Sequence, residues 1–351
     1  MRAMGRTRDE HVKVGRMPRG RWQVLTVSLI VLAMAAMTSG IALARTTAPS
    51  GSGVVIIKTT LGYQRAAATG TGMVLTSSGT ILTNNHVIRG ATRITVLVPE
   101  TNRTYTAKVV GYAVTDDVAV LRLDGASELA TVKTSGSKVS VGDPVTALGN
   151  GGGTGRLHSV TGEITTLRRT ITVRDDARGA VRLAGVMGAS AEVEPGDSGG
   201  PLFNSADAVI GMNTAGTSGY ASRSGTQAYA IPIARALSIV KQIEAGRSST
   251  RIHIGATPFL GISIASSSSN GDFTTPGAVV ASVVRGGPAA NAGVAPGDVI
   301  TAIDGRAISS SSSITAAILA KKPGAKVTIR ITDRTGAARS ATVTLASGPA
   351  Q

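Results

Sequence analysis

The chain of 351 residues contains no cysteine. This absence excludes disulfide bonds, thiolate metal sites and a cysteine nucleophile, so the folded part must rely on its core alone. Aromatic residues are also rare, at 3% of the chain, whereas glycine is abundant at 44 residues. Short β-branched runs separated by Gly and Ser turns are typical of strands, so we expect a mainly β protein.

Acidic residues are scarce relative to basic ones, with 20 Asp and Glu against 36 Lys and Arg, and the formal net charge is +16. A basic surface favours anionic partners such as nucleic acid or envelope polymers, or serves solubility alone. The first 21 residues hold seven of the Lys and Arg, and no comparable basic cluster follows. Since aromatics are few and no zinc or RNA-binding signature is present, we expect no nucleic acid partner.

A long uncharged segment, residues 22–44 ("WQVLTVSLIVLAMAAMTSGIALA"), follows the basic leader of residues 1–21. Its length suits a helix that spans a bilayer with its positive side in the cytoplasm. The segment also ends in Ala-Leu-Ala, the small-residue pattern of a signal-peptide cleavage site. Both alternatives, a retained membrane anchor and a cleaved signal, send residues 45 onward out of the cytoplasm. We therefore expect a chain that is either held at the cell membrane or secreted.

The rest of the chain divides into two modules. Short apolar runs with turn signals recur through the first module and suit a β-barrel or sandwich. A helix is expected over 234–245, where apolar residues recur at helical spacing and Gly246 follows as a stop. The boundaries we expect are 45–52 for a polar linker, 53–245 for the first module, 246–255 for a second linker and 256–347 for the second module.

Three segments carry side chains suited to nucleophilic catalysis: "GTGMVLTSSGTILTNNHVI", "TDDVAVLRL" and "EPGDSGGPLFNSADAVIGMNTAG". A serine hydroxyl is a poor nucleophile unless an imidazole takes its proton and a carboxylate orients that imidazole. Ser198 lies in the glycine-rich third segment, and His86 ends a predicted strand that runs into a turn. The second segment offers two carboxylates, Asp116 and Asp117, directly before an apolar strand.

Taken together and in this order, the three segments resemble the trypsin-like HtrA family of serine proteases. The resemblance covers residues 53–245 and implies a trypsin-like double β-barrel. Residues 256–347 resemble the α+β PDZ domain that follows it in that family. The resemblance also implies a serine endopeptidase that cuts unfolded or damaged envelope or secreted polypeptides. We therefore expect a mainly β chain with two folded domains behind an N-terminal hydrophobic helix.

The resemblance implies a catalytic triad of His86, Asp117 and Ser198. Asp117 is selected over Asp116 because the carboxylate of the family directly precedes the aliphatic strand. Ser198 would attack the scissile carbonyl, His86 would act as general base and then general acid, and Asp117 would hold the imidazole. No metal or other cofactor is implied.

The glycines around Ser198 indicate backbone held in an unusual shape, although a plain turn is the alternative. Gly196 would let the N–H groups of Gly196 and Ser198 converge on the developing oxyanion. Asp197 stands where the family often has Asn, and we expect a loop residue that serves local geometry. The segment "GNGGG" at Gly149 is expected to be a flexible loop, and His158 after it a loop residue, because no helix with Lys-Ser/Thr follows.

Substrate-binding residues are expected on both sides of the serine. The segment "MNTA" resembles the family's substrate-binding edge strand, which implicates Asn213, Thr214 and Ala215, with a core strand as the alternative. Glu192, six residues before Ser198, could pair with a Lys or Arg of the substrate or turn toward solvent. Because the pocket of this family usually accepts small aliphatic residues, we favour Val, Ala or Leu before the cut.

The second module carries two segments, "PFLGISI" and "GGPAANAGVAPGDVITAIDG", that resemble the PDZ signature. Backbone N–H groups at Leu260 and Gly261 would hold a peptide carboxylate, while the peptide pairs along Ile262 to Ile264. The alternative is a module used only for packing or assembly. The partners we expect are therefore unfolded polypeptides and peptide C-termini, a membrane through residues 22–44 if these are retained, and a homotrimer, which the family often forms.

A second function class is a peptide-binding chaperone or scaffold in which the protease is idle. The presence of Ser, His and Asp in the family settings argues against it, because a scaffold has no need of them. A third class, a basic surface that binds envelope polymers or nucleic acid, depends on charge alone. We therefore favour the serine endopeptidase.

Overall fold

A computed structural model describes residues 50–175, 179–214, 228–265 and 276–351. The hydrophobic segment expected at 22–44 lies outside these residues. Among the helices of the described ranges, none combines the length and the apolar character needed to cross a bilayer.

The first half of the peptidase region is an antiparallel β-barrel. Its strands are β1 (Val54–Leu61), β2 (Ala66–Val74), β3 (Thr80–Thr83), β4 (Arg93–Val98), β5 (Arg103–Ala113) and β6 (Val118–Leu123). They pair in the order β5-β4-β1-β2-β3-β6, and a further pairing of β5 with β6 closes the ring. Three short helical turns connect them: η1 (Gly62–Gln64), α2 (Asn85–Ile88) and η2 (Val114–Asp116). The turns α2 and η2 carry or flank the predicted His and Asp.

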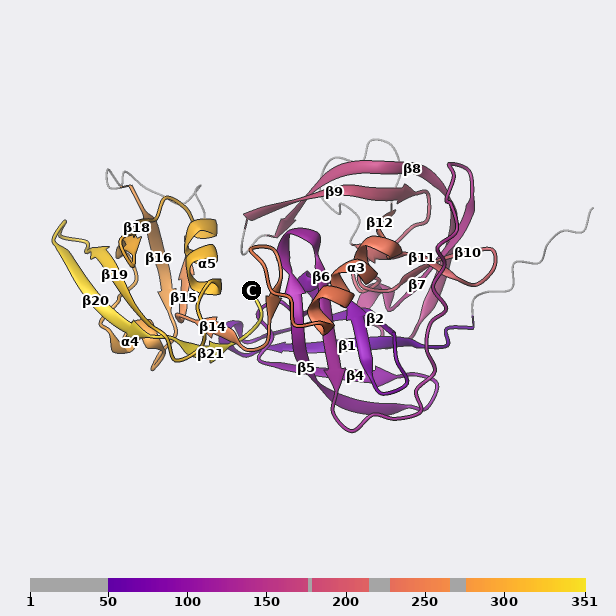
Figure 1. Ribbon diagram of the computed structural model, residues 1–351, viewed down its shortest axis with the longest axis horizontal. Coiled ribbons are helices and arrows are strands. Elements are labelled where there is room, and N and C mark those ends of the chain that lie inside the picture. The colour runs from indigo at the N-terminus through magenta and orange to yellow at the C-terminus, as the bar shows by residue number, and fades with distance from the viewer. Residues whose placement is uncertain (1–49, 176–178, 215–227, 266–275) are drawn as a thin grey trace, which may run out of the picture. The chain divides into compact units, whose positions relative to one another are not determined.

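A second closed barrel follows. Its strands are β7 (Pro144–Gly149), β8 (His158–Asp175), β9 (Gly179–Ala189), β10 (Pro201–Asn204), β11 (Val209–Thr214) and β12 (Ala228–Pro232), with the turn η3 (Gly151–Gly153) after β7. They pair in the order β10-β11-β12-β9-β8-β7, and β10 pairs again with β7. Figure 1 shows β8 and β9 as a hairpin that is long relative to the other strands. The double barrel confirms the mainly β, trypsin-like expectation.

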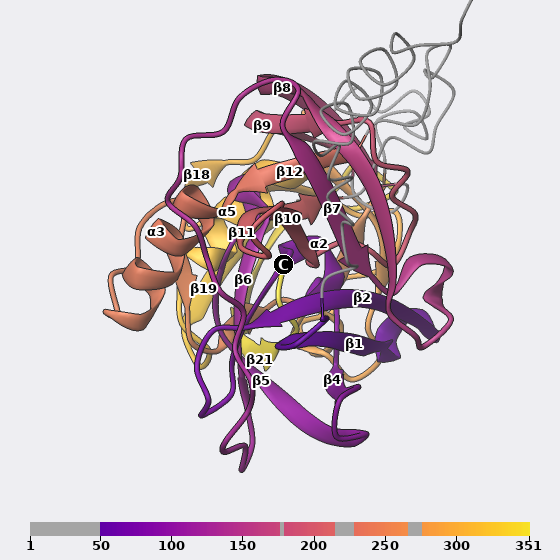
Figure 2. The ribbon, with the colours of Figure 1, turned by 90° about the vertical axis from the view of Figure 1, so that its right-hand side faces the viewer.

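Strand pleating explains why the two barrels pack together. Neighbouring residues of a strand point to opposite faces, so each strand can serve two cores. On β6, Leu121 lies in the core inside the first barrel, whereas Val120 lies in a different core shared with Met212 of the second barrel. Figure 2 shows β1, β2 and β4 in the lower part of the view and β7, β8 and β12 in the upper part. The shared core holds together the elements that carry the predicted His, Asp and Ser.

Helix α3 (Ile233–Glu244) follows β12 and adds apolar side chains to the shared core, including Ala236 and Val240. The helix expected over 234–245 is therefore present with its start one residue earlier. The segment after it differs from the linker that its polar composition predicts. Ile252 is 5% exposed in the shared core, and β13 (His253–Ile254) pairs with β5.

The second module is an antiparallel sheet with two helices. Its sheet comprises β15 (Ile262–Ile264), β16 (Ala278–Val283), β17 (Val299–Ile303), β19 (Lys326–Thr332) and β20 (Ala338–Thr344), paired in this order, with β18 (Arg306–Ala307) on β17. A separate two-stranded sheet pairs β14 (Thr257–Phe259) with β21 (Ala346–Gly348). The helices are α4 (Pro288–Asn291) and α5 (Ser311–Leu319). The α+β composition agrees with the predicted PDZ fold.

Helix α5 begins inside the run of serines. The Ser310 hydroxyl accepts a hydrogen bond from the Ser313 N–H, and the Ser313 side chain accepts one in return from the Ser310 N–H. Such a capping box satisfies N–H groups that a helix start leaves unpaired. The polar run therefore marks a helix start.

Candidate active site

His86 lies on the one-turn helix α2, in place of the turn that the sequence indicated after the strand. Its ring Nδ1 is 2.8 Å from Asp117 Oδ2, and its backbone N–H donates to Asp117 Oδ1 at 3.0 Å. The ring is one-third exposed, and the carboxylate is 8% exposed. Since an ionised carboxylate only accepts hydrogen bonds, Nδ1 carries the proton and Nε2 is left as the acceptor on the other side of the ring.

Asp117 is held from three further directions. Its φ of 53° places it in the left-handed region directly after η2, with its N–H donating to Val114 O. The Thr214 hydroxyl, from the second barrel, donates to Asp117 Oδ2 at 2.9 Å, and Asn84 Nδ2 donates to the Asp117 carbonyl at 2.9 Å. The carboxylate is therefore fixed by groups from both barrels. Of the two candidate aspartates, the structure brings Asp117 to His86.

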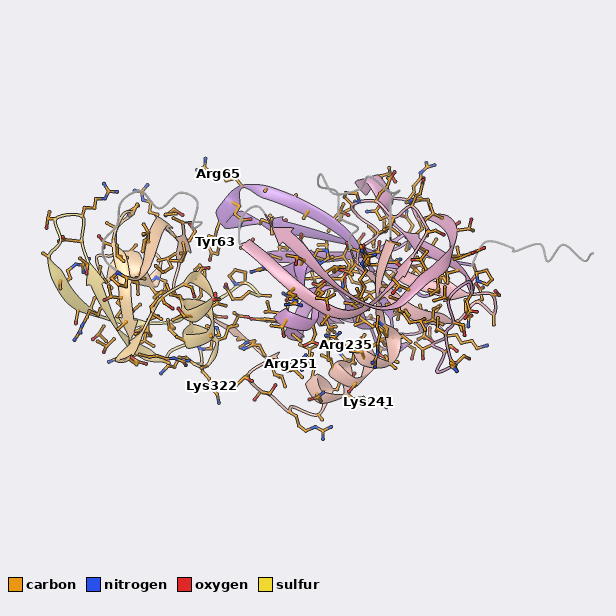
Figure 3. The ribbon with its side chains drawn as sticks, turned by 90° about the horizontal axis from the view of Figure 1, so that it is seen from above. Tyr63, Arg65, Arg235, Lys241, Arg251 and Lys322 are labelled. Atoms are coloured by element: carbon orange, nitrogen blue, oxygen red, sulfur yellow. The ribbon has the colours of Figure 1, made fainter. Side chains whose placement is uncertain are left out.

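Asp116 points to a different set of partners. Its carboxylate is 3% exposed and accepts hydrogen bonds from Arg235 Nε at 3.1 Å and Arg235 Nη2 at 2.5 Å. Arg251 Nη2 lies 2.6 Å from one of its oxygens and 2.7 Å from the other. Figure 3 labels both arginines, which come from α3 and from the segment after it. The sequence assigned no role to this residue, because neither arginine is near it along the chain.

The Ser198 loop is bonded to both barrels. The Ser198 carbonyl accepts a hydrogen bond from the Thr71 N–H of β2 at 2.8 Å. The Gly199 N–H donates to Asn213 O of β11, and the Asn213 N–H donates to Gly200 O. A Cβ on Gly70 would lie 2.7 Å from Val87 Cγ1 and 3.3 Å from Ser198 O. Helix α2 and the Ser198 loop therefore meet at the same point of β2, and no larger residue fits between them.

Gly196 is required by both its backbone angle and its surroundings. Its φ is +109°, and a Cβ there would lie 2.2 Å from Asn150 O. Among the described residues, the N–H groups of Gly196 and Ser198 donate no hydrogen bond, whereas the Asp197 N–H between them donates to Glu194 O. The loop thus leaves two donors unpaired, and it does so beside the serine.

Asp197 is buried under this loop, at 2% exposure. Its Oδ2 accepts the Glu194 N–H at 2.9 Å and lies 3.9 Å from His158 Nε2, while Oδ1 has no partner within the described part of the chain. Burial raises the pKa of the Asp197 carboxyl, an effect that the Glu194 N–H and the His158 ring partly oppose.

No group of three or more His, Asp or Glu in the described ranges could hold a metal ion.

The glycine-rich segment after β7 packs more tightly than the flexible loop expected from its composition. The Gly152 N–H donates to Pro195 O, and a Cβ on Gly151 would lie 1.9 Å from the His158 ring. His158 begins β8, so it is not a loop residue. Gly149, where the segment begins, also lies close to Asp197, since a Cβ there would lie 2.6 Å from Asp197 Oδ1. These close approaches require glycine.

The predicted substrate-binding residues have different settings. Glu192 is exposed, and Ala215 lies outside the described residues. Asn213 is 1% exposed, and its N–H, its carbonyl and its side-chain Nδ2 are all bonded within the fold. Its backbone therefore cannot pair with a peptide, and the core-strand alternative describes it better. Thr214 contacts Asp117 instead of solvent.

The predicted carboxylate-binding residues of the second module lie at the start of the edge strand β15. Gly261 has a φ of +81°, and its carbonyl accepts the Val284 N–H at 2.8 Å. The Leu260 carbonyl accepts the Ala289 N–H of α4. Within the described residues, the N–H groups of Leu260 and Gly261 donate no hydrogen bond. Two N–H groups without a partner among the described residues therefore adjoin β15, which lies at the end of the strand order.

Comparisons with known proteins agree with this architecture. Residues 70–212 match the trypsin-like peptidase domain, and residues 258–345 match the PDZ domain. Serine protease PepD of Mycobacterium tuberculosis is 34% identical over 308 residues, which are 83% of this chain and 63% of the relative. A probable periplasmic serine endoprotease, DegP-like, of Pseudomonas fulva is 33% identical over 82% of this chain and 58% of the relative.

A solved structure, HtrA-type protease AlgW with tripeptide, aligns with a TM-score of 0.46 and 28% identity, over 86% of this chain and 95% of that chain. The chain spans about three-fifths of the length of the two relatives described above. Both relatives are more than 30% identical to this chain over more than four-fifths of its length. This chain, a trypsin-like peptidase domain followed by a PDZ domain, therefore belongs to the HtrA-like serine protease family.

Proposed function

We propose that the chain is a serine endopeptidase that hydrolyses peptide bonds through an acyl-enzyme intermediate. Ser198 Oγ attacks the scissile carbonyl while His86 Nε2 takes its proton. The same imidazole then gives the proton to the leaving amine. In the second half of the reaction it takes a proton from water, which attacks the acyl ester, and returns the proton to Ser198 Oγ. Asp117 holds the ring tautomer and stabilises the imidazolium that forms in each step.

Two observations carry this proposal: both oxygens of Asp117 accept hydrogen bonds from His86, and the N–H groups of Gly196 and Ser198 have no acceptor among the described residues. The first arrangement fixes which ring nitrogen can act as a base. The second supplies donors for the oxyanion of the tetrahedral intermediate, worth about 3–4 kcal/mol for each donor in comparable sites. A scaffold with an idle protease would need neither arrangement.

The substrates that we propose are unfolded or damaged polypeptides, with the PDZ domain binding peptide C-termini at Leu260, Gly261 and Ile262. The open edge of β15 and its two unpaired N–H groups support this role. We propose that the specificity pocket takes Val, Ala or Leu. Glu192 is exposed, so its carboxylate is already solvated and gains little from pairing with a Lys or Arg of the substrate.

We also propose an extracytoplasmic location, because one of the relatives is named as a periplasmic endoprotease. Residues 22–44 would then be either a membrane anchor or a cleaved signal. Mass spectrometry of the mature N-terminus separates the two, since Arg45 as the first residue means cleavage. A homotrimer is part of the proposal, and light scattering coupled to size-exclusion chromatography measures it.

Labelling with an active-site serine phosphonate, together with casein cleavage, tests the endopeptidase. We expect the wild type to be labelled and to cleave casein. Ser198→Ala and His86→Ala should each lower kcat by about 10⁶-fold with an unchanged circular dichroism spectrum. Full activity of a clean Ser198→Ala preparation would remove the proposal. A wild type that binds peptides but is neither labelled nor active would favour the scaffold.

A further inference from the structure

We propose that Asp116 is a positioning residue for Asp117, and that Arg235 and Arg251 hold it in this role. The inference rests on the proposed function, because it concerns how the carboxylate of the peptidase is kept in place. It adds to the site a part of the chain after α3 that the sequence predicts to be a linker.

The first step is the burial of the Asp116 carboxylate. At 3% exposure it has lost nearly all contact with water, and a carboxylate in that state requires compensating charge and hydrogen bonds. Arg235 and Arg251 supply both, with four contacts of 2.5 to 3.1 Å. Arg235 and Arg251 are 30% and 64% exposed, but the carboxylate is buried, so removing an arginine leaves its charge less compensated. Asp116 is therefore tied firmly to the two arginines.

The second step is the backbone that joins Asp116 to Asp117. Asp116 is the last residue of η2, and Asp117 follows in the left-handed region with a φ of 53°. A residue other than glycine rarely keeps this conformation unless its surroundings hold it there. On the far side the turn is held by Asn84 Nδ2, which donates to the Asp117 carbonyl. On the near side the anchor is Asp116, so the two contacts hold the turn from opposite ends.

The third step is the support behind the arginines. Arg235 lies in the first turn of α3 and also donates to the carbonyl of Ala184 on β9. Arg251 precedes Ile252, which is buried, and His253, which pairs with Tyr112 on β5 one residue before the strand ends at Ala113. Figure 3 shows the labelled side chains of Arg235 and Arg251 close to each other, as their shared partner requires. The cluster thus connects Asp117 to the second barrel and to residues 251–254.

The experiment compares Asp116→Asn and Arg251→Met with two controls in the full chain. Arg247→Met changes an exposed arginine of the same segment, and Asp124→Asn changes an exposed aspartate that is paired with Lys108. We expect Asp116→Asn and Arg251→Met to lower kcat by about 10-fold to 100-fold with KM unchanged. A loss of this size is expected when a catalytic group is displaced by up to about 1 Å. Arg251→Lys should recover part of the loss because it keeps the charge.

A spectroscopic readout separates positioning from stability. The proton between His86 Nδ1 and Asp117 gives a strongly downfield resonance when the hydrogen bond is short, and this resonance can be recorded on the protein without substrate. We expect this resonance to move upfield or broaden in Asp116→Asn and Arg251→Met and to stay unchanged in both controls. This readout remains valid even if the wild type cleaves no peptide, so failure of the proposed function is recognised separately.

The proposal is overturned if the variants have a lower melting temperature but the kcat and the downfield resonance of the wild type, because Asp116 would then serve stability alone. If Asp116→Asn does not fold, Arg251→Met decides. The Arg251 side chain is 64% exposed, so its loss leaves the core intact. A wild-type resonance and rate in a folded Arg251→Met variant would also overturn the role of Arg251.

Discussion

Two turns of this molecule each place an aspartate directly before a proposed catalytic residue, Asp116 before Asp117 and Asp197 before Ser198. Both aspartates are buried, at 3% and 2% exposure. Asp116 has two arginines on its carboxylate. Asp197 has a backbone N–H on one oxygen and a histidine at 3.9 Å, and its other oxygen has no hydrogen-bond partner in the part of the chain that the structure describes. Both turns therefore contain a buried carboxylate, but the charge of Asp116 is compensated by two arginines and that of Asp197 is compensated only in part.

The difference has a consequence for how each turn responds to its surroundings. Asp116 is neutralised by fixed cations that stay charged at any working pH, because arginine does not deprotonate in proteins. Asp197 has no arginine or lysine partner among the described residues, and burial raises the pKa of its carboxyl. The turn of Asp117 should therefore be sensitive to mutation of its partners, and the loop of Ser198 should be sensitive to pH.

Among the variants that compare the two turns, the largest effect is expected when the carboxylate that contacts His86 is neutralised. In Asp117→Asn, the amide can present a donor to Nδ1, which favours the wrong ring tautomer, and kcat should fall by about 10⁴-fold. Steady-state kinetics on a peptide substrate measure it, and Asp116→Asn is the matched comparison with its smaller loss. Retention of a tenth of the wild-type kcat by Asp117→Asn would mean that the resemblance selected the wrong aspartate.

A smaller loss is expected from Gly196→Ala in the loop of Ser198. The added Cβ would lie 2.2 Å from Asn150 O, so the loop must shift and one N–H donor leaves its position. We expect kcat to fall by about 10²-fold to 10³-fold, the effect of losing one oxyanion donor. Gly125→Ala is the control, because Gly125 also has a positive φ but has nothing within 4 Å. An equal loss in both variants would point to backbone strain in place of the contact with Asn150.

The pH dependence of stability should separate the two turns. Because the pKa of Asp197 is raised in the folded state, the folded chain binds this proton more tightly than the unfolded chain does. The resulting stabilisation is present below the ordinary pKa of Asp and is lost as the pH rises through the raised value. Asp197→Asn removes this dependence while keeping an acceptor for the Glu194 N–H.

The free energy of unfolding of Asp197→Asn, measured relative to wild type by urea titration between pH 4 and 7, should therefore increase with pH. Asp207→Asn, on the exposed turn between β10 and β11, is the control and should show a constant difference. A difference that stays constant for Asp197→Asn, or that decreases with pH, would contradict a raised pKa.

The smallest effect is expected at the surface pair of Lys108 and Asp124, 2.9 Å apart. The Lys108 ammonium beside it lowers the pKa of the Asp124 carboxyl, yet both side chains are exposed and the attraction is screened by salt. Asp124→Asn should leave kcat and the melting temperature within experimental error at low and at high salt. A clear loss of either would mean that exposed ion pairs also contribute to the activity or stability of this chain.

Local patterns predicted much of the fold and the residues of the site. Alternating apolar residues indicated the strands, and His86 and Ser198 stand in motifs whose residue types already indicate nucleophilic catalysis. Other parts depend on partners distant in sequence. Asp116 and Asp117 are neighbours in a polar turn, and their different partners distinguish their roles. The arginines that bind Asp116 lie 119 and 135 residues away in the sequence and reach it only in the folded chain. The segment 246–255 reads as a linker because its pairing with β5 leaves no periodic signal in so short a strand.

By itself, the sequence determined the chemistry available to this protein: no thiol, four histidines, and a serine in a glycine-rich segment that resembles a known catalytic motif. These are properties of residue type and short spacing, which need no knowledge of the partner elements. The tertiary structure decided which carboxylate meets His86, which one is neutralised by Arg235 and Arg251, and that Asn213 is closed to a peptide. The reason is that burial and long-range contacts decide whether a group is charged and whether its donors and acceptors are already paired. Burial and these contacts arise only when the chain folds.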